Sequence, residues 1–218
     1  MISSGYKFFY IIFVTGSKFF SSNNIMVYKE DKYYLDKVLQ GNADSYSFII
    51  NKYKSKAFTL ALRILKNRED AEEASQDAFI KCYYGLNDFS YKSSFSTWLY
   101  RIVYTSSISM LRQKKPAAIE LDDTIVDSAG PELREINSAL DKLKDEEQKY
   151  YVNLALSTLD EEDVSILTLY YQLEKSAEEI GEITGLSRSN VKIKLFRIRK
   201  KLQQNLEKIL KEEVYSLL

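Results

Sequence analysis

The sequence predicts an all-α protein made of two small helical-bundle domains joined by an acidic linker. Glycine and proline are rare, with 7 Gly and 2 Pro in 218 residues, too few for a turn-rich β-sandwich. Hydrophobic residues make up 45% of the chain, enough to build a core, and in the long segments they recur at the three- and four-residue steps of an amphipathic helix. Both prolines, Pro116 and Pro131, fall in one stretch between two helix-rich parts.

The composition also excludes several kinds of chemistry. The chain contains no histidine, so imidazole catalysis and His-ligated zinc are excluded. Its one cysteine, Cys82, excludes an internal disulfide and a cysteine-cluster metal site. The sequence also lacks a glycine-rich phosphate loop and paired carboxylates in an apolar setting. We therefore expect no metal and no cofactor, and we expect that the protein is not an enzyme.

Residues 1–25 form an N-terminal extension that differs from the rest. Lys7 precedes an apolar run over residues 8–14, far shorter than the roughly 20 residues that span a bilayer. A charge before a short apolar run is the outline of a signal peptide, but no small-x-small cleavage pattern follows. We interpret the extension as not functional, with the working start at Met26. A signal peptide and an ordered but dispensable arm remain alternatives.

The first domain is predicted over residues 26–115. An apolar stripe predicts an amphipathic helix over residues 44–66. Asp70 is the expected N-cap of a second helix that runs from Ala71 to about Leu86. A third helix should start near Ser94 or Ser96 and end in a basic last turn before Pro116, as the helix dipole prefers.

Residues 116–147 are predicted to be a linker between the domains. They hold both prolines and ten acidic residues against three basic ones. The second domain is predicted over residues 148–213. Here the four consecutive acids of residues 160–163 open a helix, and a helix-turn-helix pattern follows over residues 176–195.

Each part of the helix-turn-helix pattern has a steric reason. Gly181 lets the second helix approach closely, and Gly185 can adopt a positive φ at the turn. Ser187 is placed to cap the second helix. Ile180, Leu186, Val191 and Leu195 would fill the small core between the two helices.

The charge of the second helix favours DNA as its partner. The net charge of the chain is zero, yet residues 187–203 carry seven basic residues and no acid. Arginine can bond guanine bidentately and asparagine adenine, while the later bases would contact phosphates. A solvated basic face is the alternative. The DNA-binding candidates on this helix are Arg188, Ser189, Asn190, Lys192, Lys194, Arg197 and Arg199.

Two segments together resemble a known family. Residues 68–81, residues 95–102 and Leu111-Arg112 resemble the first conserved domain of the extracytoplasmic-function (ECF) sigma factors, within the sigma-70 family of bacterial RNA polymerase sigma factors. Residues 159–202 resemble the second conserved domain of that family. The resemblance implies a cytoplasmic protein that binds core RNA polymerase, recognises the −35 and −10 promoter elements and promotes promoter opening and transcription initiation.

The resemblance also implies where the polymerase binds. In that family the second helix of the first domain docks on the coiled-coil of the β′ subunit, and the β subunit is contacted as well. Acids and an amide around exposed apolar residues are typical of a protein–protein patch. Carried onto this chain, the docking face is Glu73, Gln76, Asp77, Phe79, Ile80 and Tyr83. The alternative is that Phe79 or Ile80 belongs to the core.

The next helix and its leading loop would recognise and open the −10 element. Unstacking a base costs a few kcal/mol, and an aromatic platform can return about 1–3 kcal/mol. The candidates are Tyr91, Lys92, Trp98, Tyr100, Arg101, Tyr104, Thr105, Arg112 and Lys114. Trp98 could instead be core. Thr105 and Ser109 stand where the family often has Asn and Asp, so −10 readout there departs from the family pattern.

Further partners follow from the resemblance. A cognate anti-sigma factor is common in that family and can be membrane-bound, while this chain itself is not expected to insert into a membrane. A dimeric helix-turn-helix regulator and a helical adaptor without DNA binding are the competing classes. The regulator would not need the acidic and aromatic face of residues 70–86, and the adaptor would not need the basic helix.

Overall fold

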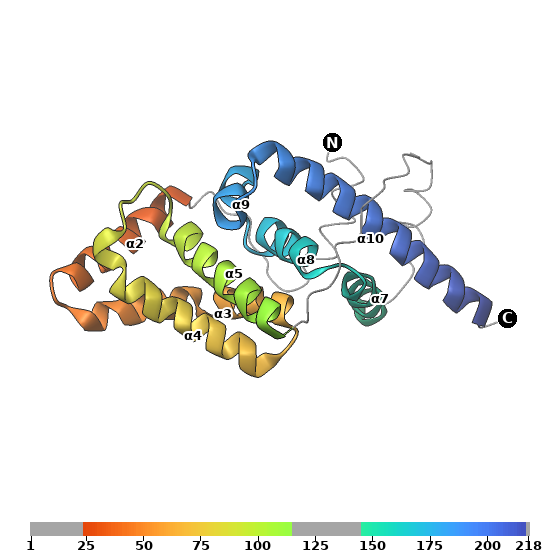
Figure 1. Ribbon diagram of the computed structural model, residues 1–218, viewed down its shortest axis with the longest axis horizontal. Coiled ribbons are helices and arrows are strands. Elements are labelled where there is room, and N and C mark those ends of the chain that lie inside the picture. Colours follow the sequence, from red (N-terminus) through yellow and green to blue (C-terminus); the bar gives the residue numbers. More distant parts are fainter. Residues whose placement is uncertain (1–23, 115–144, 217–218) are drawn as a thin grey trace.

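The computed structural model describes residues 24–114 and 145–216, and these residues are helical with no strand among them. Two helical bundles follow each other along the chain (Figure 1). The first bundle holds α2 (Asn24–Leu39), α3 (Tyr46–Leu65), α4 (Arg68–Tyr84) and α5 (Phe95–Lys114). The second bundle holds α7 (Asp145–Ser157), α8 (Glu161–Leu167), α9 (Ala177–Thr184) and α10 (Arg188–Ser216). The all-α fold class predicted from the sequence is confirmed.

Three short segments join these helices. A 3₁₀ turn, η1 (Ala43–Ser45), precedes α3, and a second one, η2 (Leu86–Asp88), follows α4. A π-helical turn, η3 (Thr168–Gln172), extends α8 and packs beside α9. The extension at residues 1–23 and most of the predicted linker lie outside the described residues. Helix α2 begins at Asn24, and thus crosses the predicted boundary at Met26.

The core of the first bundle lies between α3, α4 and α5. Its helices bury much of the apolar stripe that the sequence predicts, including Tyr53, Ala57 and Leu99, although Phe48 of that stripe is exposed. The hydroxyl of Tyr46 donates to the carbonyl oxygen of Phe79 at 2.8 Å, which ties α3 to α4. Alanines 71, 74 and 78 are buried on α4, and their small side chains let α3 and α5 pack closely against it.

The start of α4 corrects one sequence expectation. Asn67, not Asp70, caps this helix, and the Asn67 side chain accepts a hydrogen bond from the Asp70 amide at 3.0 Å. Asp70 lies in the first turn, where its negative charge still faces the positive end of the helix dipole. Its carboxylate accepts from Lys114 at 2.6 Å, so α4 begins beside the end of α5.

The helix-turn-helix has the geometry that its sequence predicts. Ser176 and Glu179 form a reciprocal capping box at the start of α9. Gly185 adopts a φ of +82° after α9, a conformation that favours glycine. The side chain of Ser187 accepts from the amide of Asn190 at 3.2 Å and so caps α10. Gly181 is buried, and a Cβ atom there would lie 2.7 Å from the carbonyl oxygen of Leu186.

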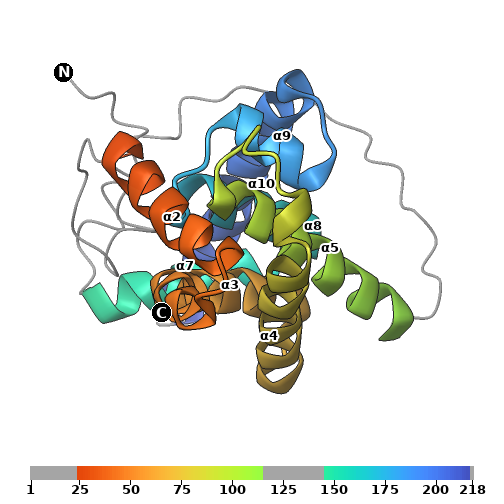
Figure 2. The same ribbon diagram turned by 90° about the vertical axis from the view of Figure 1, so that its left-hand side faces the viewer.

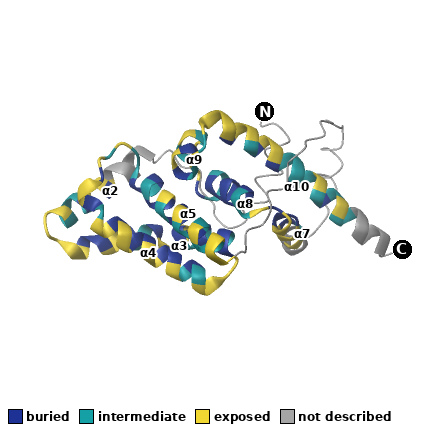
Figure 3. Ribbon diagram, viewed as in Figure 1, coloured by how far each residue is buried: buried dark blue, intermediate teal, exposed yellow. Residues whose placement is uncertain are grey.

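The two bundles also pack against each other, which the sequence did not predict. Helix α9 lies along α5, and α8 lies along α3, as the two perpendicular views agree (Figures 1 and 2). The buried residues of both bundles form one continuous cluster. Figure 3 places the buried residues on the facing sides of the helices, while the outer faces of α4 and of the first turns of α10 are exposed.

We predict that Gly181→Ala destabilises the second bundle. The added methyl group would press on the backbone oxygen of Leu186, which cannot rotate away, and overpacking of this kind costs about 1–3 kcal/mol. Denaturant unfolding followed by circular dichroism measures the loss. Glu178→Ala, an exposed change on the same helix, should alter the free energy of unfolding by less than about 0.5 kcal/mol. Equal stability of the two variants would contradict the close approach of α9 to the backbone of the turn at Leu186.

Candidate nucleic-acid interface

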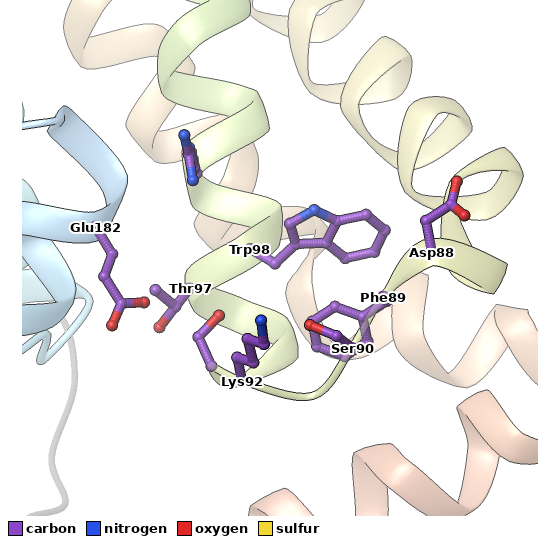
Figure 4. Close-up of a pocket in the computed structure, with 9 residues that line it drawn as sticks. Asp88, Phe89, Ser90, Lys92, Thr97, Trp98 and Glu182 are labelled. Carbon is purple, nitrogen blue, oxygen red and sulfur yellow. The ribbon is translucent and has the colours of Figure 1, made fainter.

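A cleft opens where the loop after α4 meets the first turns of α5 (Figure 4). Its volume is about 330 Å³, which is large enough for a planar ring system. Trp98 stacks on Phe89 in its wall, with ring centroids 4.7 Å apart and planes inclined by 15°. Phe95 packs edge-on against the same indole. Trp98 is partly buried, so the ring is both a support for the loop and a surface of the cleft.

The loop that leads into α5 is held by its own contacts. Tyr91 adopts a φ of +55°, and its hydroxyl donates to Asp36 at 3.0 Å. The ammonium group of Lys32 lies 4.9 Å from the centroid of the Tyr91 ring. Together with bonds from Lys32, this hydrogen bond lowers the pKa of Asp36. Tyr91 therefore anchors the loop to α2 and positions the residues that follow.

The rim of the cleft carries two exposed basic side chains, Lys92 and Arg101. The hydroxyl-bearing residues Ser90, Ser93 and Thr97 also line the cleft. Such a combination of aromatic wall, basic rim and short polar donors suits a single-stranded nucleotide. Asp88 and Glu182 also line the cleft, and Glu182 comes from α9 of the second bundle.

Two aromatic candidates differ from the sequence expectation. Tyr100 is 1% exposed and Tyr104 is 8% exposed, so neither ring offers a stacking platform in this structure. Tyr100 packs against Tyr53, and burial raises its pKa well above the usual range. Burial likewise raises the pKa of Tyr104 to about 12.

The remaining −10 candidates on α5 are spread along its length. Thr105 is exposed, but its hydroxyl donates to the backbone oxygens of Arg101 and Ile102. Arg112 is exposed in the last turns. Lys114 is engaged with Asp70 rather than presented to a partner. Of the nine predicted residues, the cleft brings together only Lys92, Trp98 and Arg101.

The outer face of α4 presents most of the predicted docking residues. Glu73, Gln76, Asp77, Ile80 and Tyr83 are exposed on it. Phe79 is buried, in line with the alternative that one of Phe79 and Ile80 belongs to the core, and its backbone oxygen accepts from the Tyr46 hydroxyl. Tyr84, which the sequence analysis did not select, is 78% exposed. In the sequence, only its position at the end of the same helix could have indicated that Tyr84 joins this face, since the spacing of an exposed tyrosine is not distinctive.

The first turns of α10 present a polar and basic surface. Arg188, Ser189, Asn190, Lys192 and Arg197 are all exposed there. Val191 and Leu195 turn inward to the helix-turn-helix core. Ile193 and Phe196 are also exposed on these turns, although sequence reasoning did not name them. Apolar side chains that lie among basic residues on such a helix can contact thymine methyl groups. In the sequence, these two residues could have been noticed because they interrupt the run of basic residues.

Two of the predicted DNA contacts on α10 are instead engaged within the bundle. Lys194 pairs with Glu162 at 2.9 Å and with Asp163 at 3.5 Å. The Nε atom of Arg199 donates to the hydroxyl of Tyr171 at 2.8 Å. The Arg199 guanidinium also lies over the rings of Tyr170 and Tyr171. Both side chains lie on the side of α10 that faces the bundle. Counting basic residues along the sequence does not separate them from the bases on the exposed side.

The acids at the start of α8 receive these inward bases. Asp160 caps α8 by accepting from the amide of Asp163 at 2.7 Å. Burial, with the adjacent Asp160 charge, raises the pKa of Asp163 to about 6. Lys201 lies within 4 Å of both carboxylates and, like Lys194, offsets their negative charge. This cluster joins α8 to α10 and fixes how α10 is presented.

The described part of the chain gives no sign of a metal or membrane site. No group of three acidic or cysteine side chains in residues 24–114 and 145–216 is arranged to hold a metal ion. Over the same ranges, no helix has both the length and the apolar character needed to cross a bilayer.

Family models match both bundles. The description Sigma-70 region 2 matches residues 49–116, which contain α4, the cleft and α5. The description Sigma-70, region 4 matches residues 149–202, which contain the helix-turn-helix. A region 2 module followed by a region 4 module defines an RNA polymerase sigma factor.

Comparison with known proteins identifies the kind of sigma factor. The chain is 31% identical over 180 residues to "ECF RNA polymerase sigma factor SigW" of Bacillus subtilis, covering 79% of this chain and 94% of that protein. It is 26% identical over 192 residues to "RNA polymerase sigma-H factor" of Pseudomonas aeruginosa, covering 86% of this chain and 100% of that protein. The chain belongs to the ECF family of RNA polymerase sigma factors. The resemblance drawn from its two motifs is thus confirmed.

Solved structures share the fold. CnrH, solved in complex with the cytosolic domain of CnrY, is similar with a TM-score of 0.59 and 19% identity, covering 82% of this chain and 97% of that one. The sigma factor RpoE, solved with the anti-sigma factor NepR from Bartonella quintana, is similar with a TM-score of 0.50 and 17% identity. That match covers 74% of this chain and 96% of the other.

We predict that Arg199→Gln lowers the stability of the second bundle, whereas Arg197→Gln does not. Arg199 bonds Tyr171 and packs on two rings, and losing a bond of this kind costs about 1–2 kcal/mol. Arg197 is exposed two residues earlier, so its change should stay within about 0.5 kcal/mol. Thermal unfolding of the two variants makes the comparison. A stable Arg199→Gln variant would return Arg199 to the list of DNA contacts.

Proposed function

We propose that this ECF sigma factor binds core RNA polymerase, recognises the −35 and −10 promoter elements and promotes promoter opening and transcription initiation. The observation that carries the proposal is the exposed face of α10, where Arg188, Ser189, Asn190, Lys192 and Arg197 project from a capped helix-turn-helix. The N-terminal turns of such a helix are the ones that enter the major groove. In this role the chain is an initiation subunit rather than an enzyme, and it works in the cytoplasm with the polymerase.

The −35 element is assigned to α10. Arg188 and Asn190 lie at the start of the helix, and their side chains can bond guanine and adenine edges. Lys192 and Arg197 lie farther along and would hold phosphates. Ile193 and Phe196 add an apolar strip that suits thymine methyl groups.

The −10 element is assigned to the cleft beside α5. A base released from the duplex would enter against the stacked Trp98 and Phe89 rings. Stacking on an aromatic platform returns about 1–3 kcal/mol, which offsets the few kcal/mol of unstacking. Lys92 and Arg101 on the rim would neutralise the flanking phosphates. No ATP is needed, because captured bases are removed from the duplex equilibrium.

The polymerase is assigned to the outer face of α4. There Ile80, Tyr83 and Tyr84 form an exposed apolar group beside Glu73, Gln76 and Asp77. An apolar centre with a polar margin is the usual anatomy of a protein interface. The β′ coiled-coil is the partner expected for this helix, and the β subunit is a further expected contact. A cognate anti-sigma factor, which can be membrane-bound in the resembled family, is a further expected partner, and the similar RpoE structure holds the anti-sigma factor NepR.

The combined substitution Arg188→Ala and Asn190→Ala should abolish −35-dependent transcription by purified core polymerase. Each good bidentate base contact contributes about 1–3 kcal/mol of discrimination, so promoter use should fall at least about tenfold. Run-off transcription on promoters with intact and scrambled −35 elements measures the effect. Lys208→Ala, an exposed change farther along α10, is the matched control. If the double variant still distinguishes the two promoters, α10 is not the −35 reader.

The combined substitution Gln76→Arg and Ile80→Ala should prevent capture of core polymerase. It removes the most central exposed apolar side chain of the α4 face and adds a charge beside it. A pull-down with purified core enzyme should retain less than about a tenth of the wild-type amount. Lys54→Ala, on the outer side of α3, should be captured normally. Normal capture of the double variant would move the docking surface away from α4.

A further inference from the structure

Two aspartates at the start of α8 lie close enough to share a proton. Asp160 caps the helix by accepting from the amide of Asp163 at 2.7 Å, which brings the two carboxyl groups together. Their side-chain oxygens also lie within hydrogen-bonding reach of each other. An ionised carboxylate only accepts hydrogen bonds, so a bond between the two groups requires a proton on one of them. The pair therefore has a place for one proton.

The surroundings of the pair place this proton on Asp163. Asp163 is 9% exposed, so burial disfavours its charged form. Burial, followed by the charge of Asp160, raises the pKa of Asp163 to about 6. Although burial opposes it, the hydrogen bonds that Asp160 accepts from the amide and the carboxyl group of Asp163 lower the pKa of Asp160. Asp163 is therefore the donor within the pair and the group that titrates near neutral pH.

Two lysines of α10 compensate the negative charge of these acids. The ammonium group of Lys194 lies 2.9 Å from a carboxylate oxygen of Glu162 and 3.5 Å from one of Asp163. The ammonium group of Lys201 lies 3.7 Å from Asp160 and 3.8 Å from Asp163. Asp163 is thus the one acid that both lysines contact. A proton on Asp163 weakens both pairings at once, because it removes the charge that they share.

Groups from the first bundle face the same end of α8. The phenol of Tyr104 on α5 lies near the acids of α8, whose charges add to the effect of burial in raising its pKa. Lys66, at the end of α3, pairs with Glu161 at 3.5 Å. The two lysines that contact Asp163 itself both come from α10. The state of this carboxyl group therefore acts directly on the helix assigned to the −35 element.

Lys194 lies at the edge of the proposed DNA-reading face of α10. It follows Asn190 by one helical turn and precedes Arg197 by one turn, and both of these residues are exposed. The Lys194 side chain is 31% exposed. Its flexible four-carbon stem allows the ammonium group to move from the acids of α8 to a phosphate beside those residues. The DNA backbone and the acids can therefore compete for the same ammonium group.

We propose that −35 DNA competes with the acid pair of Asp160 and Asp163 for Lys194, and that Asp163 takes up a proton from solvent when Lys194 moves to a phosphate. This inference rests on the proposed −35 role of α10. When Lys194 leaves, Asp163 loses a countercharge and holds a proton more strongly. By linkage, a lower pH loosens Lys194 and strengthens −35 binding. Affinity for the −35 element should thus rise as the pH falls from about 7.5 toward about 6.

NMR of the full-length chain with isotopically labelled aspartate carboxyl carbons tests the shared proton without polymerase. We expect one carboxyl signal to titrate near pH 6 and to be missing in Asp163→Asn. Asp160→Asn keeps an N-cap residue and should shift this titration to lower pH, because the neutral amide no longer repels the Asp163 charge. If every aspartate titrates below about pH 5, the pair holds no proton and the proposal is wrong.

Binding of the holoenzyme to promoter DNA tests the competition. The preference for an intact over a scrambled −35 element should be at least about threefold stronger near pH 6 than near pH 7.5. Asp163→Asn imitates the protonated pair and should show the stronger preference at both pH values. Lys194→Gln should show no pH dependence, because the competing ammonium group is gone. Glu174→Gln removes an exposed carboxylate before α9 and is the matched control, which should behave as the parent does.

The two measurements separate the possible failures. A −35 preference that does not change with pH, in a chain whose Asp163 titrates near pH 6, would overturn the competition. PH dependence retained in Asp163→Asn would assign the proton to another group and would also overturn it. A holoenzyme that does not distinguish intact from scrambled −35 elements at either pH would count against the proposed function of α10. The NMR titration would then still decide whether the acid pair holds a proton.

Discussion

The structure depends on the packing of α9 on two sides at once. One side meets the turn before α10 so closely that a methyl group on Gly181 would lie 2.7 Å from the carbonyl oxygen of Leu186. The other side meets the first turn of α5 through Lys175 and Glu179. A helix of eight residues therefore packs against the turn before α10 and, at the same time, forms one wall of the cleft beside α5. Both of the surfaces that we propose to read the promoter lie next to this one helix.

Local signals made the fold and much of the site predictable. Apolar periodicity located α3 and α5, and the Ser176, Gly181 and Gly185 pattern located the helix-turn-helix, because caps, tight turns and close approaches each require particular residue types. Which side a residue faces was less predictable. Lys194 and Arg199 lie in the same basic run as Arg197, and only the packing of α8 and η3 against α10 distinguishes them. Tyr100 and Tyr104 are buried in this structure, and Tyr100 packs on Tyr53 of α3, a contact between helices that the spacing of aromatic residues along α5 alone does not reveal.

Electrostatic pairing connects the surfaces in a consistent way. The zero net charge of the chain conceals acids at the start of α8 and bases along α10, and the structure brings these together in part. The bases on the inner half of α10 are neutralised by Glu162 and Asp163, while those on the outer half remain for a polyanion. The pairing therefore anchors α10 to α8 and leaves only the bases on its exposed side available to a partner. The α4 face, with its mixed acids and aromatics, is chemically suited to protein rather than DNA.

The length of α10 has a consequence for how such a protein can change its preferences. The helix runs through 29 residues from Arg188 to Ser216, about 43 Å, so its base-reading turns and its core-anchoring turns form one rod. Leu202 and Leu206 are buried far along this rod and never approach the groove. A substitution at either position would change how α10 packs on the rest of its bundle and so change the direction in which its first turns project. Promoter preference can therefore drift during evolution through side chains that make no contact with nucleic acid.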